Sequence, residues 1–237
     1  MNEEDFESDE LDLTLYADAN ELVEEVTSQI LAQIAAGIAE RNRFDLVLTG
    51  GTLGISLSES LIHHFNSVPH DYQGLHIWFS DERFVERSSP ERNAIAFETS
   101  LKNSNIVVHQ ALPSNEADAL ESLAKLRDEV KGVSFDLNVL GLGPDGHVAS
   151  IFPGRKELDI TDDLFLISDS PKPPSTRISF SMHLINQARE VWIIAAGASK
   201  ADAVTAIIES DTSVPATYVR GAQHTRLIID TEAFFSE

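Results

Sequence analysis

The stretch that decides the fold is FDLNVLGLGPDGHVASIFPG, residues 135–154. Its first half is a short, nearly continuous apolar run, which is typical of a strand buried on both faces of a parallel sheet. Its second half changes to glycines and then places Asp145 and His147 two residues apart, beside what reads as the start of a helix. The chain therefore ends a buried strand on a flexible loop that carries an acid and a titratable base.

The same pattern recurs on both sides of this stretch. Apolar segments predict further strands at 44–51, 74–84, 105–109, 190–197 and 225–230. Hydrophobic periodicity predicts helices over 18–40, 52–65, 117–130 and 200–209. Strands that alternate with helices imply right-handed crossovers. The predicted fold class is therefore α/β, with a single doubly wound, mostly parallel sheet and helices on both faces, as in Rossmann-like folds.

The composition of the chain limits which classes of partner it is expected to bind. The 237 residues carry a formal net charge of −22, which argues against nucleic acid or an anionic membrane as a partner. No apolar run approaches the roughly 18 residues of a membrane span, and the acidic N-terminus does not resemble a signal peptide. Zero cysteines exclude disulfides and thiolate chemistry. These features fit a cytoplasmic protein; the sequence does not give the oligomeric state, although a monomer is slightly favoured.

Domain organisation follows from the same composition. No linker rich in Gly, Ser or Pro divides the chain, and no internal repeat is present. We expect an acidic, disordered tail over residues 1–10. Residues 11–237 are expected to form a single α/β domain.

Polar and glycine residues follow four of the predicted strands. They are Gly50 to Thr52, Ser80 to Arg83, Asp145 with His147, and Gly197 to Lys200. In open α/β sheets, ligands bind outside the carboxyl ends of the strands. The four strand ends are therefore predicted to converge on one crevice.

Part of this set has the chemistry of an anion site. The TGGT segment, 49–52, presents backbone N–H groups at a helix N-terminus, which favours phosphate, although a tight turn that needs glycine for its backbone alone is the alternative. Arg177 follows the proline-rich segment 170–176, which can fix the direction of its guanidinium. Lys200 opens a helix, where a cation is unfavourable unless an anion compensates it. Together these residues predict a phosphate clamp.

Other site types have less support in the sequence. The segment GLGPDG, 141–146, matches the glycine pattern of dinucleotide sites but lacks an acidic residue at the end of a following strand. The histidines show no metal-ligand spacing, and no G-x-S-x-G elbow presents a serine nucleophile. We therefore expect no metal and no cofactor. His147, at a strand end after glycines, is the candidate catalytic base.

The constellation resembles the 6-phosphogluconolactonase family. The motifs that carry the resemblance run in family order over residues 13–230: LTGGT, WFSDERFV with ERNA, LGLGPDGHVASIFPG, SDSPKPPSTRIS, REVWIIAAGASKADAV and PATYV. Glucosamine-6-phosphate deaminases share the fold group and an Asp-Gly-His loop, but typically have Asp-Glu-Tyr where this chain has Asp81-Glu82-Arg83. The arginine favours the lactonase. Two departures are Val148, where threonine is common, and a glycine loop that reads Gly-Gly-Thr-Leu-Gly in place of Gly-Gly-Ser-Thr-Pro.

The resemblance implies a reaction and a set of catalytic roles. The reaction is hydrolysis of 6-phospho-D-glucono-1,5-lactone to 6-phosphogluconate, the second step of the oxidative pentose phosphate pathway, with no metal or cofactor. His147 would activate water and later protonate the leaving ring oxygen. Arg83 would stabilise the oxyanion, Asp81 would hold Arg83 or a sugar hydroxyl, and Asp145 would shape the loop or orient His147.

The resemblance also assigns the phosphate, while other functions stay open. The residues expected to hold the 6-phosphate are Gly50, Gly51, Thr52, Arg177 and Lys200. The alternatives are a sugar-phosphate isomerase or deaminase with Asp81 as base, a dinucleotide-dependent oxidoreductase, and a sensor that binds the sugar phosphate without turnover.

Overall fold

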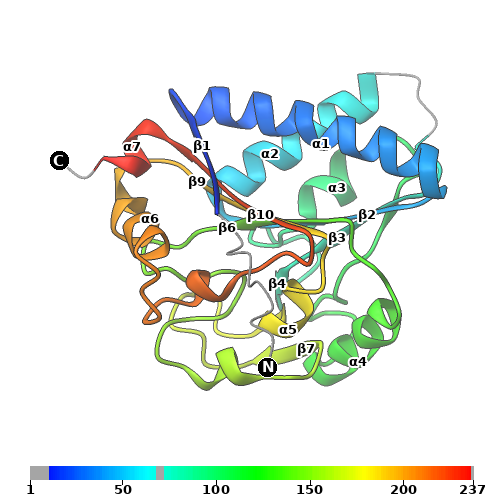
Figure 1. Ribbon diagram of the computed structural model, residues 1–237. Coiled ribbons are helices and arrows are strands. Elements are labelled where there is room, and N and C mark those ends of the chain that lie inside the picture. The colour runs from blue at the N-terminus through cyan, green and yellow to red at the C-terminus, as the bar shows by residue number, and fades with distance from the viewer. Residues whose placement is uncertain (1–10, 68–71, 236–237) are drawn as a thin grey trace, which may run out of the picture.

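The structure is a computed structural model, which describes residues 11–67 and 72–235 (Figure 1). The predicted acidic tail, residues 1–10, lies outside the described residues.

The main sheet has seven strands, and every pair of neighbours in it is parallel. In spatial order the strands are β1 (Asp12–Tyr16), β10 (His224–Asp230), β9 (Glu190–Ala195), β6 (Leu137–Gly141), β2 (Phe44–Leu48), β3 (Leu75–Phe79) and β5 (Val107–Val108). The predicted α/β class with a doubly wound parallel sheet is confirmed. β1 was not predicted, because its five residues alternate between half-buried and exposed positions and lack a continuous apolar run.

Helices cover both faces of this sheet. The helices are α1 (Ala19–Arg41), α2 (Gly51–Ser67), α3 (Ile95–Ser100), α4 (Ala119–Val130), α5 (Met182–Ile185), α6 (Ala201–Ile208) and α7 (Thr231–Phe234). Short 3₁₀ turns occur at Lys156–Asp159, Ala198–Lys200 and Pro215–Tyr218. α1, α2 and α3 lie together on one face, at the top of Figure 1, and pack into one buried cluster. α4, α5 and α6 contribute to a second cluster across the sheet.

The longest helix shows why the sequence folds this way. Apolar residues recur every four positions in α1, and the side chains of Leu22, Val26, Ile30 and Ile34 are buried against the sheet. Asp18 caps its N-terminus, since its carboxylate accepts hydrogen bonds from the backbone N–H groups of residues 20 and 21. The predicted helix over 18–40 is confirmed within one residue at each end.

A second, three-stranded antiparallel sheet packs on the face that carries α4 and α5. Its strands, in order, are β4 (Asp81–Arg83), β8 (Arg177–Phe180) and β7 (Leu164–Ile167). The sequence did not predict this sheet, since its strands have three or four residues each and two of them carry charged side chains. It places the predicted charged residues Asp81, Arg83 and Arg177 on paired strands.

The structure of the loop after β6 differs from the one predicted. A helix was predicted to start beside Asp145 and His147, but residues 142–155 form turns with an isolated bridge between Val148 and Ile151. Gly146 and Ala149 have positive φ values of 77° and 48°, outside the right-handed helical region, so the backbone does not continue as a helix.

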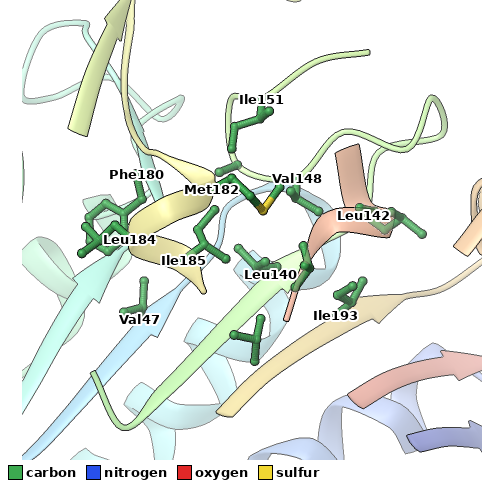
Figure 2. Packing of buried hydrophobic residues seen from close by; sticks show 14 of the residues in the cluster. Val47, Leu140, Leu142, Val148, Ile151, Phe180, Met182, Leu184, Ile185 and Ile193 are labelled. Carbon is green, nitrogen blue, oxygen red and sulfur yellow. The ribbon is translucent and has the colours of Figure 1, made fainter. Parts of the chain in front are cut away.

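This loop is nevertheless firmly anchored. Val148 and Ile151 are fully buried, and Figure 2 shows both in the cluster that also holds Met182 of α5 and Leu140 of β6. The position at which threonine is common in similar sequences is therefore an apolar packing position in this chain.

β2 and β6 are neighbours at the point where the connections of the sheet diverge. The chain leaves β2 toward β3 on one side, whereas β6 pairs with β9 on the other. Ligands bind at such a switch point, outside the carboxyl ends of the strands. The glycine loop after β2 and the Asp145–His147 loop after β6 both begin there.

Candidate functional site

A cavity of about 1090 Å³ opens at this switch point. It is lined by residues that follow β2, β3, β6, β9 and β10, so the predicted convergence of strand ends is confirmed. The predicted site residues in its lining are Gly50, Gly51, Thr52, Asp81, Arg83, His147, Arg177 and Lys200. Asp145 is not part of the lining but contacts His147 directly.

The glycine loop delivers a helix N-terminus to the cavity. α2 begins at Gly51, and its first turn contains no acidic residue, so the positive end of the helix dipole is not neutralised there. Gly51 has a φ of 75°, which other residues adopt at a cost. At Gly50, a Cβ would overlap the side-chain amide of Asn93. Both glycines are therefore required by the backbone that presents these N–H groups.

The loop after β6 joins three charged or titratable groups. Asp145 Oδ1 lies 2.5 Å from His147 Nδ1 and 3.0 Å from Lys172 Nζ, and Lys172 Nζ lies 3.2 Å from the same imidazole nitrogen. Burial alone would raise the pKa of Asp145, but hydrogen bonds from His147 and Lys172 lower it to about 2. The ionised carboxylate accepts both bonds, which puts the imidazole proton on Nδ1 and leaves Nε2 as a free acceptor.

The same surroundings favour the neutral form of His147. Burial lowers the pKa of His147, the hydrogen bond to Asp145 raises it in part, and the nearby Lys172 ammonium lowers it again. The imidazole also packs on Phe152, with ring centroids 4.7 Å apart. It lies so close to the backbone that a Cβ at Gly143 would overlap Nδ1. The imidazole of His147 therefore has a fixed orientation, and its surroundings favour the neutral form.

Asp81 links three segments of the site. Its Oδ2 accepts a hydrogen bond of 2.6 Å from Ser150 Oγ, and its Oδ1 accepts one of 2.9 Å from Asn93 Nδ2. Arg177 Nη1 lies 3.5 Å from Asp81 Oδ2. Among the described residues the ion pair of Asp81 is therefore with Arg177 and not with Arg83.

Arg83 points to the cavity from the end of β4. Its Nη1 donates to the carbonyl oxygen of Glu91 at 2.6 Å, whereas its buried Nε has no hydrogen-bond partner among the described residues. The preceding residue, Glu82, is buried and accepts bonds from the backbone N–H groups of Arg83, Asn93 and Ala94. These bonds tie the backbone at Arg83 to that of residues 93 and 94.

Arg177 and Lys200 differ in their surroundings. Arg177 is buried, and it donates to the backbone oxygens of residues 172, 173 and 174, so it holds the proline-rich loop as well as Asp81. Lys200 makes no ion pair among the described residues. Burial lowers its pKa most, and the positive charge of Lys172 lowers it further. Among the described residues, the ammonium of Lys200 is therefore free to meet an anion, and so is the guanidinium of Arg83, which likewise makes no ion pair with a carboxylate.

Sequence reasoning did not single out three contributors to the site. Lys172 lies in the proline-rich motif and contacts the Asp145–His147 pair, while Asn93 and Ser150 hold Asp81. Each occurs within a quoted motif, but nothing in the local sequence shows that these motifs meet in space. A cation among the prolines was the one available signal for Lys172.

The described residues contain no cluster of three or more His, Asp or Glu side chains that could hold a metal ion. In the same part of the chain, no helix is long and apolar enough to span a membrane.

The sequence and the fold of this chain are similar to those of known proteins. The family model described as glucosamine-6-phosphate isomerases/6-phosphogluconolactonase matches residues 17–229. The 6-phosphogluconolactonase of Mycobacterium tuberculosis is 32% identical, with 93% of this chain and 96% of that protein covered. That of Streptomyces coelicolor is 31% identical, with 95% and 94% covered. The crystal structure of 6-phosphogluconolactonase from Thermotoga maritima superposes with a TM-score of 0.82 at 26% identity, covering 94% of this chain and 100% of that one.

Proposed function

Because this chain belongs to the glucosamine-6-phosphate isomerase/6-phosphogluconolactonase family, we propose that it hydrolyses 6-phospho-D-glucono-1,5-lactone to 6-phospho-D-gluconate. The chain is an enzyme, a lactone hydrolase of sugar-phosphate metabolism. The reaction places it at the lactone-opening step of the oxidative pentose phosphate pathway.

The single observation that carries the proposal is the His147–Asp145 pair at the cavity. A lactone is an activated ester, so its hydrolysis needs a deprotonated water and no covalent nucleophile. With Nδ1–H held by Asp145 Oδ1 at 2.5 Å, His147 takes the water proton on Nε2. It then returns that proton to the ring oxygen as the tetrahedral intermediate collapses. Asp145 stays ionised throughout and stabilises the transient imidazolium.

Arg83 is proposed to stabilise the negative charge that develops on the carbonyl oxygen. Its side chain lines the cavity, and the Glu91 carbonyl fixes one end of the guanidinium through Nη1. A charged donor held in place before the reaction needs no reorganisation when the oxyanion forms. Asp81 is proposed to position Arg177 and, through Ser150, the loop after β6.

The 6-phosphate is proposed to bind at the other end of the cavity. Backbone N–H groups of Gly50, Gly51 and Thr52 and the Lys200 ammonium would contact its oxygens, and Arg177 would add its charge from the adjacent wall. Hydrogen bonds to charged groups contribute about 1.5–3 kcal/mol each, so three or four of them would supply most of the substrate affinity.

The test is hydrolysis of freshly generated lactone, followed as the appearance of 6-phosphogluconate. The lactone also opens spontaneously, so the quantity to measure is the rate above background. We expect acceleration by the wild type and a fall in kcat of about 10²–10⁴-fold in His147→Ala. His183→Ala, which changes an exposed histidine outside the cavity lining, is the matched control.

Two outcomes would contradict the proposal. Folded wild-type protein that does not accelerate lactone opening would exclude the lactonase, and release of ammonia from glucosamine 6-phosphate would then identify the related deaminase. A His147→Ala variant with intact kcat and weaker binding would exclude the histidine as the base.

A further inference from the structure

Lys172 has no role in the chemistry described so far, yet it lies in contact with the base. It belongs to the proline-rich loop before β8 and reaches the loop after β6 from there. Its Nζ is 3.0 Å from Asp145 Oδ1 and 3.2 Å from His147 Nδ1. Its Nζ also lies 6.0 Å from the centroid of the Phe152 ring, on which His147 packs.

The loop that carries Lys172 is itself held in place. The backbone oxygens of Lys172 and Pro173 accept hydrogen bonds of 3.0 Å from Arg177 Nη2, and that of Pro174 accepts one of 3.2 Å from Arg177 Nε. Arg177 is buried and paired with Asp81. The Lys172 ammonium therefore reaches Asp145 from a loop whose backbone Arg177 holds in place. Its position depends in this way on the rest of the site.

We propose that Lys172 is a positioning residue for the proposed hydrolysis, holding Asp145 Oδ1 against His147 Nδ1 so that Nε2 is the imidazole nitrogen that accepts the proton of water. Asp145 Oδ1 accepts from both groups at once, so the ammonium fixes the carboxylate that in turn orients the ring. Its positive charge beside Nδ1 also opposes protonation of the ring. The inference rests on the proposed role of His147 as the base.

Among the charged groups of the described residues that act on His147, Lys172 is the one that opposes protonation of the ring. Asp145, on the same loop, and Asp81, on β4, both favour the charged ring, whereas Lys172 favours the neutral one. With Lys172 removed, the two carboxylates would leave His147 easier to protonate.

Two further cations face this group from other elements. Arg177 of β8 also lies beside Phe152, with its Cζ 5.9 Å from the ring centroid, and it is paired with Asp81. Lys200, which lines the cavity, is close enough for the charges of Lys172 and Asp145 to act on its ammonium. Neither makes a hydrogen bond to the imidazole among the described residues, so the ammonium at 3.2 Å is the cation whose removal the ring should sense most strongly.

The test compares Lys172→Met with Lys172→Arg, using Lys131→Met, which removes an exposed lysine outside the cavity lining, as the control. The first readout is the pH dependence of kcat/KM. We expect the acid limb to move to higher pH in Lys172→Met and to be restored in Lys172→Arg. A rise of one pKa unit would reduce activity about tenfold at a pH below both values. On the plateau, kcat is expected to fall about 10- to 100-fold because the ring is less well oriented.

The second readout needs no turnover. Titration of the His147 imidazole by NMR in the ligand-free protein, assigned with His147→Gln, should show a higher pKa in Lys172→Met than in the wild type and in Lys131→Met. If Lys172→Met fails to fold by circular dichroism, Lys172→Gln takes its place in both measurements.

Two results would overturn the role of Lys172. One is an unchanged titration of His147 in the folded variant. The other is a raised KM with an unchanged acid limb and kcat, which would make Lys172 a contact of the substrate phosphate. Absence of lactone hydrolysis by the wild type would instead overturn the proposed function, and the NMR titration separates the two failures.

Discussion

The two faces of the main sheet differ in how they are covered and in what they contribute to the cavity. One face carries α1, α2 and α3, and the N-terminus of α2 supplies the backbone donors of the glycine loop. The other carries the three-stranded sheet, short helices and long loops, and it supplies the side chains of Asp81, Arg83, His147 and Arg177. Backbone donors come from a regular helix, whereas the proposed catalytic side chains come from short strands and loops.

The difference has a physical origin. A helix N-terminus presents its N–H groups without any further support, so the helical face needs only apolar packing to place them. Side chains have rotational freedom, so the second face fixes them with buried polar contacts. Asp81, for example, joins Ser150, Arg177 and Asn93 through its two carboxylate oxygens. Changes in the two faces should therefore have different consequences.

The largest effect is expected from a change that moves the base. In Gly143→Ala the new Cβ would overlap His147 Nδ1 and lie 2.7 Å from Asp145 Oδ1, so the imidazole must leave its place. We expect kcat to fall by up to about 10²–10⁴-fold, as if the base were lost. Gly132→Ala is the control, because a Cβ there meets open space and strains only the backbone, whose φ is 76°. Steady-state kinetics of both variants would test this, and equal kcat values would show that His147 tolerates displacement.

Two matched substitutions of buried residues by alanine, one in each cluster, test whether the two faces contribute differently to stability and to kcat. Ile30 of α1 and Ile151 of the loop after β6 are both fully buried, one in each cluster. Each change to alanine is expected to lower the free energy of unfolding by about 2–5 kcal/mol. Only Ile151→Ala should also lower kcat, because Ile151 anchors the loop that carries His147.

Urea denaturation gives the two stabilities, and kinetics well below the unfolding midpoint gives the two kcat values. A drop in kcat of the same size in Ile30→Ala would contradict the division between the faces.

A smaller effect is expected at the phosphate end. Lys200→Ala removes a cation that makes no ion pair among the described residues, so its loss should cost binding and leave the chemistry intact. A charged hydrogen bond of about 1.5–3 kcal/mol corresponds to a rise in KM of about 10- to 150-fold with little change in kcat. Arg177→Ala should raise KM and also reduce stability, because Arg177 braces the proline-rich loop. Initial rates over a range of lactone concentrations distinguish KM from kcat, and a fall in kcat alone for Lys200→Ala would place Lys200 at the reacting centre.

The sequence predicted the helical face better than the other one. Leu22, Val26, Ile30 and Ile34 repeat every four residues, and this local periodicity is sufficient to place α1. On the second face, Asp81, Glu82 and Arg83 were predicted as the charged end of the strand over 74–84, but they form a separate strand, β4, which pairs with β8. This pairing depends on a partner far along the chain, so no local pattern can reveal it.

The candidate site divides in the same way. His147, Arg83 and Lys200 follow predicted strands, so the rule for parallel sheets is sufficient to predict that they meet at one crevice. Lys172 and Ser150 reach the site from the loops that precede β8 and follow β6, and their contacts depend on tertiary packing. The predicted helix start beside His147 was wrong because the backbone has positive φ values at Gly146 and Ala149, on both sides of His147.

The smallest expected effect is a shift in the acid limb of the pH profile, the range in which activity falls as pH falls. This shift is also the sharpest test of the second face. The active form of His147 is the neutral one, so activity is lost as pH falls through its pKa. Burial lowers that pKa from its ordinary value of 6.5, and Asp145 offsets part of the shift, so the acid limb of kcat/KM of the wild type should have its midpoint below pH 6.5. Asp145→Asn keeps an acceptor oxygen but removes the charge that raises the pKa, so its acid limb should move to lower pH even though kcat falls. Lys172→Met should move the limb the opposite way, and displacement of both limbs in the same direction would mean that the titration belongs to a group other than His147.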